Sequence, residues 1–127
     1  MDGSGRIESY RDLLVWQRAM DLAELSYVAT KDFPREETYG MIGQIRRSAA
    51  SVAANIAEGY GRESAGSYVN FLKTAQGSLK ELETHVILSS RVGLASKDVT
   101  DRILDKADEI GRMLRGLIRS LQQDVKS

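Results

Sequence analysis

Cysteine is missing from this 127-residue chain, proline and histidine each occur once, and neither sign of charge is in excess, with 18 basic and 18 acidic residues. The lack of cysteine excludes disulfides and thiolate metal sites, and it fits a reducing compartment such as the cytoplasm. The scarcity of proline favours long helices, because proline is the strongest helix breaker. Since the charges balance, the whole protein has no general attraction for nucleic acid, and any basic binding site must be local.

Long apolar runs are also missing. No uncharged stretch approaches the roughly 20 residues that a membrane-spanning helix requires, and the start of the chain, MDGSGRIESYRD, has no apolar signal-peptide core. We therefore expect a cytoplasmic protein with no membrane contact. Residues 1–8 are predicted to form a flexible leader, and residues 9–127 to form one domain that is large enough to bury a core.

Apolar residues recur at spacings of three and four in four stretches, which is the period of an amphipathic helix. The predicted helices span residues 9–31, 38–58, 64–92 and 97–124. Four long helices with short connections pack most simply as an antiparallel up-down-up-down bundle. No stretch has the two-residue period of a strand, so the predicted fold class is all-α.

Breaks between these helices are marked by turn residues. Pro34 separates the first two helices, Gly59 and Gly61 are expected to end the second, and Gly93 is expected to end the third. Ser64 and Ser96 are placed to cap the third and fourth helices, because a serine hydroxyl accepts from a free backbone N–H of the first turn.

In the first predicted helix, one line of residues is expected to face the core. It contains the only tryptophan, Trp16, which is therefore interpreted as a packing residue rather than as a platform for a ligand. The line consists of Leu13, Trp16, Met20, Ala23 and Tyr27.

The second predicted helix carries no charge from Ser48 to Ala57. A helix that is uncharged all round is normally covered all round, although each helix of a four-helix bundle keeps an outer face. Either the other three helices cover it or a second subunit does. We favour the subunit, with Ala50, Ala54 and Asn55 at the interface, and we expect Asn55 to hydrogen-bond to backbone groups.

Residue patterns for catalysis or metal binding are not found in the sequence. A di-iron bundle needs Glu-x-x-His motifs, whereas the only histidine, His85, has Leu82 at that spacing. Nucleophilic catalysis would lack a cysteine, and the glycines of GYGRESAG do not form a phosphate-binding loop. We therefore expect no catalytic residue, no metal and no cofactor.

Arginines are the strongest candidates for a binding site. Arg112, Arg115 and Arg119 share one line of the fourth predicted helix, after a run of aspartates on the same line. Acids near the start of a helix and bases near its end also complement the helix dipole, so the line can be purely structural. Its functional interpretation is a basic cluster that contacts RNA phosphates and is repeated by symmetry in an oligomer.

Two adjacent arginines of the second predicted helix point about 100° apart and are expected to have different roles. We assign Arg46 to RNA binding, together with the later arginines. Arg47 is assigned to a structural ion pair, with Glu58 or Glu83 as its partner.

Three segments resemble one bacterial family: YRDLLVWQRAMDLA, FPREETYGMIGQIRRSAASVAANIAEGYGR and YVNFLKTAQGSLKELETHVILSSRVGL. They are similar to four-helix-bundle proteins named after open reading frames in intervening sequences of large-subunit ribosomal RNA genes, also called ribosomal-protein-S23-like. The resemblance implies a homo-oligomer, commonly a pentameric ring, without enzyme activity. It also suggests kinship with accessory proteins of diversity-generating retroelements, which bind a reverse transcriptase and nucleic acid.

Two functions stay open at this point. The leading hypothesis is a non-enzymatic, self-assembling scaffold that engages RNA or an RNA-handling protein such as a reverse transcriptase. The alternative is a purely protein-binding adaptor with no nucleic-acid contact. Salt-dependent retention on RNA distinguishes them, because phosphate contacts release counterions.

Overall fold

The structure is a computed structural model that describes residues 6–126, with side chains described for residues 6–123. Residues 1–5 of the predicted leader lie outside the described residues. Residues 6–8 are exposed, and the backbone N–H of Glu8 donates to Asp12 Oδ2 at 2.9 Å. The end of the predicted leader is therefore tied to the first helical turn.

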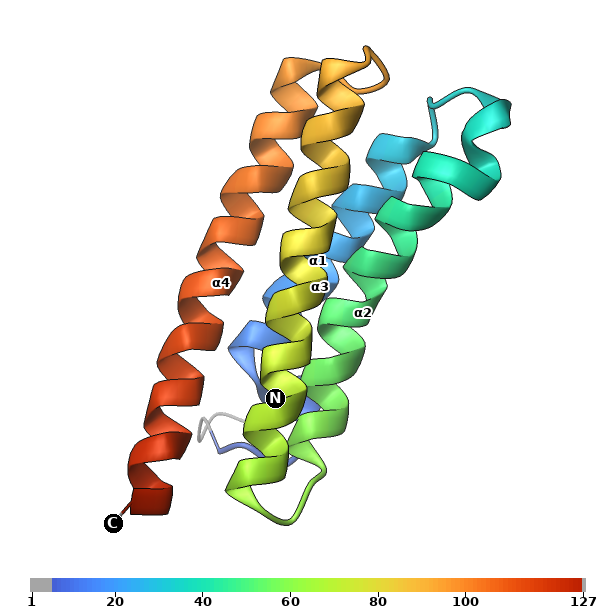
Figure 1. The fold of residues 1–127 in the computed structure, drawn as a ribbon. Helices are drawn as coiled ribbons and strands as arrows, with labels where there is room; N and C mark the ends of the chain where they lie inside the picture. The colour runs from blue at the N-terminus through green and yellow to red at the C-terminus, as the bar shows by residue number, and fades with distance from the viewer. Residues whose placement is uncertain (1–5, 127) are drawn as a thin grey trace.

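Four long helices form the molecule (Figure 1): α1 (Leu14–Thr30), α2 (Gly43–Tyr60), α3 (Ala65–Arg91) and α4 (Lys97–Lys126). Short helical turns, η1 (Tyr10–Asp12), η2 (Arg35–Glu37) and η3 (Thr38–Ile42), precede α1 and connect α1 to α2. Successive long helices run in opposite directions along the ribbon. The described part of the chain contains no strand, so the predicted all-α class with four helices is confirmed.

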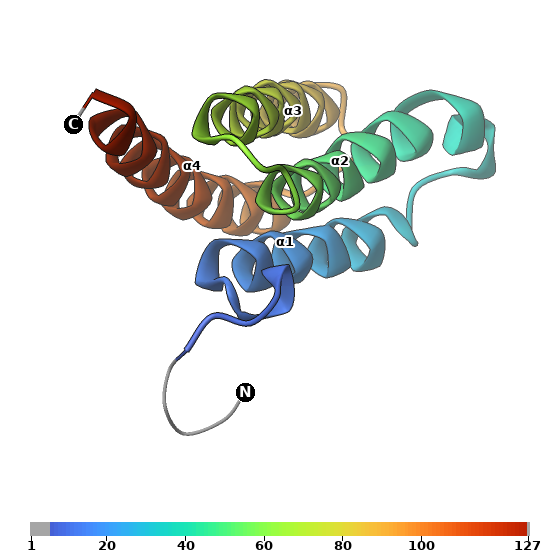
Figure 2. The same cartoon turned by 90° about the horizontal axis from the view of Figure 1, so that it is seen from below.

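Each long helix packs against two others around one core. α2 packs on α1 and α3, and α4 packs on α3 and α1, as the view along the helices shows (Figure 2). The side chains at the centre are almost completely buried, and every helix contributes to them. The largest are Leu22, Ile45, Ile56, Leu72, Leu79, Leu82, Ile103, Ile110 and Leu114.

The first helix begins later than predicted. Ser9 and Asp12 form a capping box around η1, and Leu13 then adopts an extended conformation (φ −72°, ψ 124°), so that α1 starts at Leu14. The capping box satisfies free N–H groups at the start of η1, and the extended backbone of Leu13 ends the turn. The prediction of one continuous helix from residue 9 is therefore wrong.

The second helix is also shorter at its start and longer at its end than predicted. Gly40 leaves the helical region (φ −101°, ψ −113°), and regular α-helix begins only at Gly43. α2 continues through Gly59 to Tyr60, and it ends at Gly61, the second of the two glycines expected to end it. A Cβ at Gly59 would lie 2.8 Å from the Cβ of Phe71, so glycine is required there by the close approach of α3 rather than by a helix end.

The remaining helix ends follow the predictions. Ser64 Oγ accepts from the Ser67 N–H at 3.1 Å, and Ser96 Oγ accepts from the Val99 N–H at 3.2 Å. Gly93 follows α3 with φ +83°, the left-handed conformation that favours glycine after a helix.

The buried face of α1 is not the predicted one. On the predicted line, Met20 is 38% exposed and Tyr27 is 44% exposed, while Trp16 is only half-buried. The buried line contains two hydroxyl residues, so the apolar period of the sequence favoured the other line. The buried line consists of Val15, Ala19, Leu22, Ser26 and Thr30.

Buried hydroxyls on this face are satisfied within α1. Ser26 Oγ donates to Leu22 O at 2.8 Å, and Thr30 Oγ1 donates to Ser26 O at 2.9 Å. These bonds remove the cost of burying unpaired polar atoms. Serine and threonine can therefore stand where the sequence pattern favoured larger apolar residues.

Candidate functional site

The predicted core line of α1 borders a groove between α1 and α2, which has a volume of about 760 Å³. Large side chains of α1 form one wall, and four alanines of α2 form the floor. Glu24 and Lys31 are the only charged residues in the lining. The other lining residues are Tyr10, Trp16, Met20, Ala23, Tyr27, Val28, Ala50, Ala53, Ala54 and Ala57.

The η1 turn supplies the aromatic end of this groove. Tyr10 meets Trp16 edge to face, with ring centroids 5.2 Å apart. Asp12 holds the turn, because its carboxylate accepts from the backbone N–H groups of Glu8 and Ser9. These two hydrogen bonds, that from Glu8 first, hold the pKa of Asp12 below its ordinary value of 3.8.

The three residues assigned to an oligomer interface separate into two groups. Ala50 and Ala54 are exposed in the floor of the groove. Asn55 lies elsewhere: its Nδ2 donates to Ser51 O at 2.9 Å and to Ser51 Oγ at 3.0 Å. Asn55 was expected to bond to a backbone group, and its backbone partner is Ser51 O, one turn earlier in α2.

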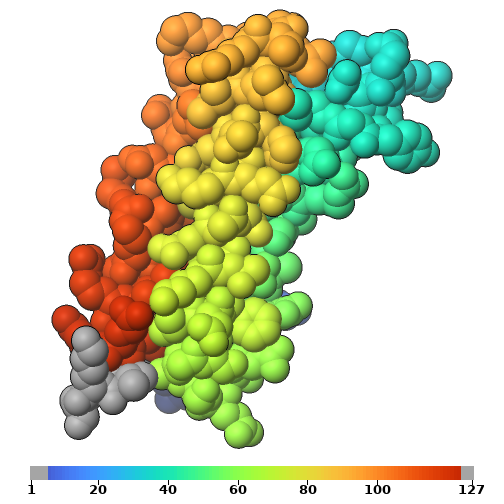
Figure 3. All heavy atoms as spheres, viewed as in Figure 1, coloured from blue at the N-terminus to red at the C-terminus, as the bar shows by residue number. Residues whose placement is uncertain are grey.

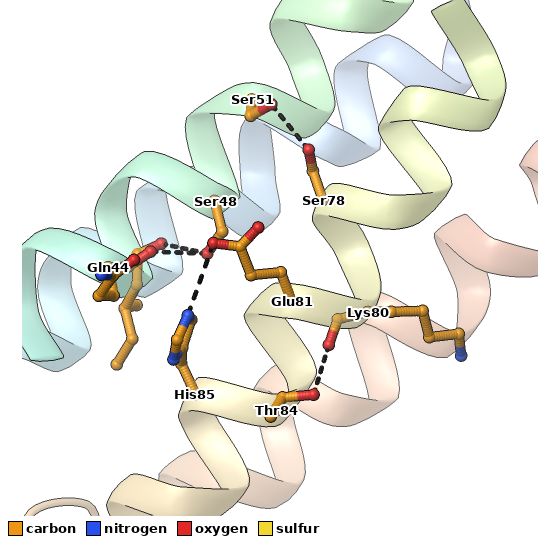
Figure 4. Close-up of polar contacts among 9 residues, drawn as sticks. Gln44, Ser48, Ser51, Ser78, Lys80, Glu81, Thr84 and His85 are labelled. Carbon is orange, nitrogen blue, oxygen red and sulfur yellow. Dashed lines mark hydrogen bonds and ion pairs between the residues drawn. The ribbon is translucent and has the colours of Figure 1, made fainter. Parts of the chain in front are cut away.

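The α3 side of the uncharged stretch of α2 is covered within the chain. Ser51 Oγ of α2 and Ser78 Oγ of α3 share a hydrogen bond (Figure 4), with the two oxygens 2.7 Å apart. Ser48 Oγ donates to Gln44 O within α2 at 2.8 Å. Cover by other helices of the chain therefore holds for part of this stretch, and cover by a second subunit stays a prediction. Other helices cover its core and α3 faces, whereas Ala50 and Ala54 stay open.

Arg46, which was assigned to RNA binding, is anchored to α1. Its Nε donates to Thr30 Oγ1 at 2.9 Å, and its Nη2 donates to Tyr27 O at 3.3 Å. Its guanidinium also lies over the Tyr27 ring, 4.6 Å from the centroid. These contacts make Arg46 a structural link between α1 and α2.

Arg47, which was assigned to an ion pair, is exposed and pairs with no carboxylate in the described part of the chain. Glu83 instead accepts from Lys80 Nζ at 3.2 Å, and Glu58 is exposed. The structural link to a neighbouring helix is therefore made by Arg46 and not by Arg47, while the RNA role assigned to Arg46 stays a prediction. The reason is the position of Thr30, which the sequence pattern did not place near Arg46.

The arginine line of α4 is exposed, as expected for an outer stripe. Arg112 pairs with Asp108 one turn earlier, whereas Arg115 and Arg119 form no ion pair with any described carboxylate. Arg115 also borders a second groove, between α3 and α4, with a volume of about 320 Å³. The α3 wall of that groove, including Gln76 and Lys80, was not predicted from the sequence. Gly77 was a signal for it, because a glycine in the middle of a helix is unfavourable without a reason.

In the described part of the chain, no group of three or more histidine and acidic residues could hold a metal ion. His85 Nε2 is 3.6 Å from Glu81 Oε1 on the same face of α3 (Figure 4). Separately, no described helix is both long and apolar enough to cross a membrane.

Comparisons with known proteins agree with the resemblance seen in the sequence. A crystal structure of a protein of unknown function from the S23 ribosomal protein family of Bacteroides thetaiotaomicron matches with a TM-score of 0.75 and 24% identity, over 83% of this chain and 98% of that one. That likeness supports the fold alone. No curated protein matches the chain. The family model of the 23S rRNA-intervening sequence proteins matches residues 11–116, and the chain belongs to that family.

Proposed function

We propose that this protein is a non-enzymatic helical scaffold that assembles with copies of itself in the cytoplasm and engages RNA or an RNA-handling protein such as a reverse transcriptase. The unit is an up-down-up-down bundle, and the assembly is a closed ring in which five subunits are favoured by the family resemblance. The observation that carries the proposal is the α1/α2 groove. An exposed apolar surface of this size marks an interaction site, because its contact with water is unfavourable.

The occupant of the groove is a second copy of this chain. Alanines in its floor allow another helix to approach closely, and three exposed apolar residues at the end of α3, Ile87, Leu88 and Val92, form a surface that can fill it. Arg91 borders that surface, and Glu24 borders the groove, so their charges are complementary.

The geometry of such a contact favours a ring. α3 lies across the bundle from α1 (Figure 2), so the groove and the α3 surface face different directions. A contact between two different surfaces is head-to-tail, and it closes into a ring when the rotation per subunit allows. A twofold dimer would instead need one surface that is complementary to itself.

RNA is the favoured further partner because the exposed arginines of α4 are incompletely neutralised. Arg115 and Arg119 have no ion pair with a described carboxylate, whereas Arg112 has one. A ring repeats this small cluster and raises the local positive potential on a neutral protein. The family's name, which refers to intervening sequences of 23S rRNA, supports the same class of partner.

The assembly is tested with Ala54→Glu. Ala54 is exposed, so a glutamate there leaves the core intact and places a charge in the groove floor. We expect light scattering to give a smaller mass than for the wild type while circular dichroism shows unchanged helicity. Thr74→Glu adds the same charge at an exposed position of α3 and should leave the mass unchanged.

Two results would contradict the proposal in different ways. A monomeric wild-type protein, or an Ala54→Glu variant of unchanged mass, removes the assembly through this groove. If the wild type assembles but is not retained on RNA at low salt, the scaffold binds protein only, and the adaptor alternative replaces RNA engagement.

A further inference from the structure

The groove between α3 and α4 is a cationic slot on a protein without net charge. Lys80 and Arg115 stand on opposite walls, and Leu79 with two glycines forms the floor. The boundary between α3 and α4 lies on the face shown in Figure 3, where the yellow atoms of α3 meet the orange and red atoms of α4. This groove is separate from the apolar α1/α2 groove, so both can be occupied in one assembly.

Gly77 keeps this slot open. A glycine in the middle of a helix is destabilising relative to alanine, yet a Cβ at Gly77 would meet no heavy atom within 4 Å. Packing within the chain therefore does not require glycine here, in contrast to Gly59. The vacant space instead suits a group that enters from outside the protein.

The cations of the slot are available to such a group. Lys80 Nζ contacts Glu83 Oε1 at 3.2 Å, but the Lys80 side chain is 72% exposed. An exposed ion pair three residues apart is weak, because water screens both charges, so a phosphate can replace the carboxylate. Arg115 has no ion pair with a described carboxylate.

The positive charge continues beyond the slot on both helices. Lys73 is two helical turns before Lys80 and shares its exposed face of α3, and Arg119 is one turn after Arg115 on α4. Since the two helices run in opposite directions, both residues extend the slot toward the same end of the bundle. The result is a cationic track rather than an isolated pair.

We propose that the α3/α4 groove seats the phosphodiester backbone of RNA, with one phosphate held between Lys80 and Arg115. The guanidinium of Arg115 can bind two phosphate oxygens at once, the ammonium of Lys80 acts as a point charge, and the amide of Gln76 donates a hydrogen bond. Contacts of this kind carry no sequence information, so binding is independent of RNA sequence. This inference rests on the RNA engagement proposed above and adds the site and its α3 wall.

The decisive variant is Gly77→Leu, which fills the slot without changing charge and should strengthen the helix. We expect its affinity for a short mixed-sequence single-stranded RNA to fall about tenfold or more, with a shallower salt dependence because at least one phosphate contact is lost. Gly66→Leu is the matched control, because a Cβ at Gly66 also meets nothing within 4 Å and Gly66 lies in the first turn of α3. Fluorescence anisotropy at two salt concentrations, on proteins of equal assembled mass, gives both quantities.

Charge variants test the same slot, since one should lower and another should raise its affinity for RNA. Lys80→Gln should weaken RNA binding, whereas Glu83→Gln should strengthen it a fewfold, because it removes the carboxylate that competes with phosphate for Lys80. If the wild type binds RNA but Gly77→Leu binds equally well, this inference is overturned while RNA engagement stands. If the wild type binds no RNA at low salt, RNA engagement itself fails, and the slot with it.

Discussion

The α1/α2 face and the α3/α4 face of the bundle are built in the same way but present opposite chemistry. Each has a groove whose floor contains very small residues, alanines in one and glycines in the other. Tryptophan, methionine and tyrosine border the first groove, whereas lysine and arginine border the second. Small residues open the space, and the larger residues at its border decide whether an apolar helix or an anion is the suitable partner.

The two faces also differ in how much of their apolar surface is buried in the core. On α1 the apolar residues cover a wider arc than the core can bury, so a complete line stays at the surface. α4 has a sharp division between a buried seam and a charged stripe. The excess of apolar surface on α1 supports the proposal that a partner covers the α1/α2 face.

The largest expected effect is a difference in stability between substitutions on the buried line of α1 and on its exposed line. Leu22→Ala removes a completely buried side chain and should lower the free energy of unfolding by about 2–5 kcal/mol. Met20→Ala, on the exposed line, should cost less than about 1 kcal/mol in an isolated subunit. Urea unfolding in the Ala54→Glu background measures both without the contribution of assembly. Equal costs would show that the exposed line belongs to the core after all.

The next effect concerns the charged stripe of α4. Replacing Arg112, Arg115 and Arg119 together with glutamine should weaken RNA binding for every sequence and make the salt slope shallower by about 2, from about 0.7 per lost phosphate contact. The same variant should keep the wild-type mass, because the assembly surface lies on other helices. RNA titrations at several salt concentrations, with light scattering as the control, check both statements. An unchanged slope would remove these arginines from the RNA site.

A smaller effect is expected for the adjacent arginines of α2. Arg46→Gln loses its hydrogen bonds to Thr30 and Tyr27 and its contact with the Tyr27 ring, and it should destabilise the fold by about 1–2 kcal/mol. Arg47→Gln should change stability by less than about 0.5 kcal/mol, as is usual for an exposed residue. Thermal unfolding of the pair tests this, and the reverse order would restore the roles expected from the sequence.

The smallest effect is a pH dependence at the aromatic end of the α1/α2 groove. Hydrogen bonds from the backbone hold the pKa of Asp12 below 3.8, so the ionised carboxylate stabilises the folded turn above that pH. The contribution is lost as the pH falls through the lower, folded-state pKa. Tryptophan fluorescence of Trp16, which contacts Tyr10 of the same turn, should report this loosening below about pH 3.8. Asp12→Asn should abolish that step, and a step of the same size in the variant would exclude Asp12 as its source.

Local patterns were sufficient for most of the fold. The three-and-four spacing of apolar residues predicted four helices and the all-α class, and Ser64, Ser96 and Gly93 were identified as helix ends from their residue types alone. The errors at the starts of α1 and α2 arose from turns that are themselves helical, namely η1 and η3. A propensity argument cannot easily separate such turns from the helix that follows.

The sequence by itself determined the helical class, the uncharged stretch of α2 and the charged stripe of α4, because each depends on residues that are neighbours within one helix. Only the tertiary structure decided which apolar line of α1 is buried, which of Arg46 and Arg47 reaches Thr30, and that Lys80 stands opposite Arg115. These outcomes depend on how far one helix is rotated against the next. Close approaches such as that of Gly59 to Phe71 help to set that rotation, and a periodicity within a single helix contains no information about it.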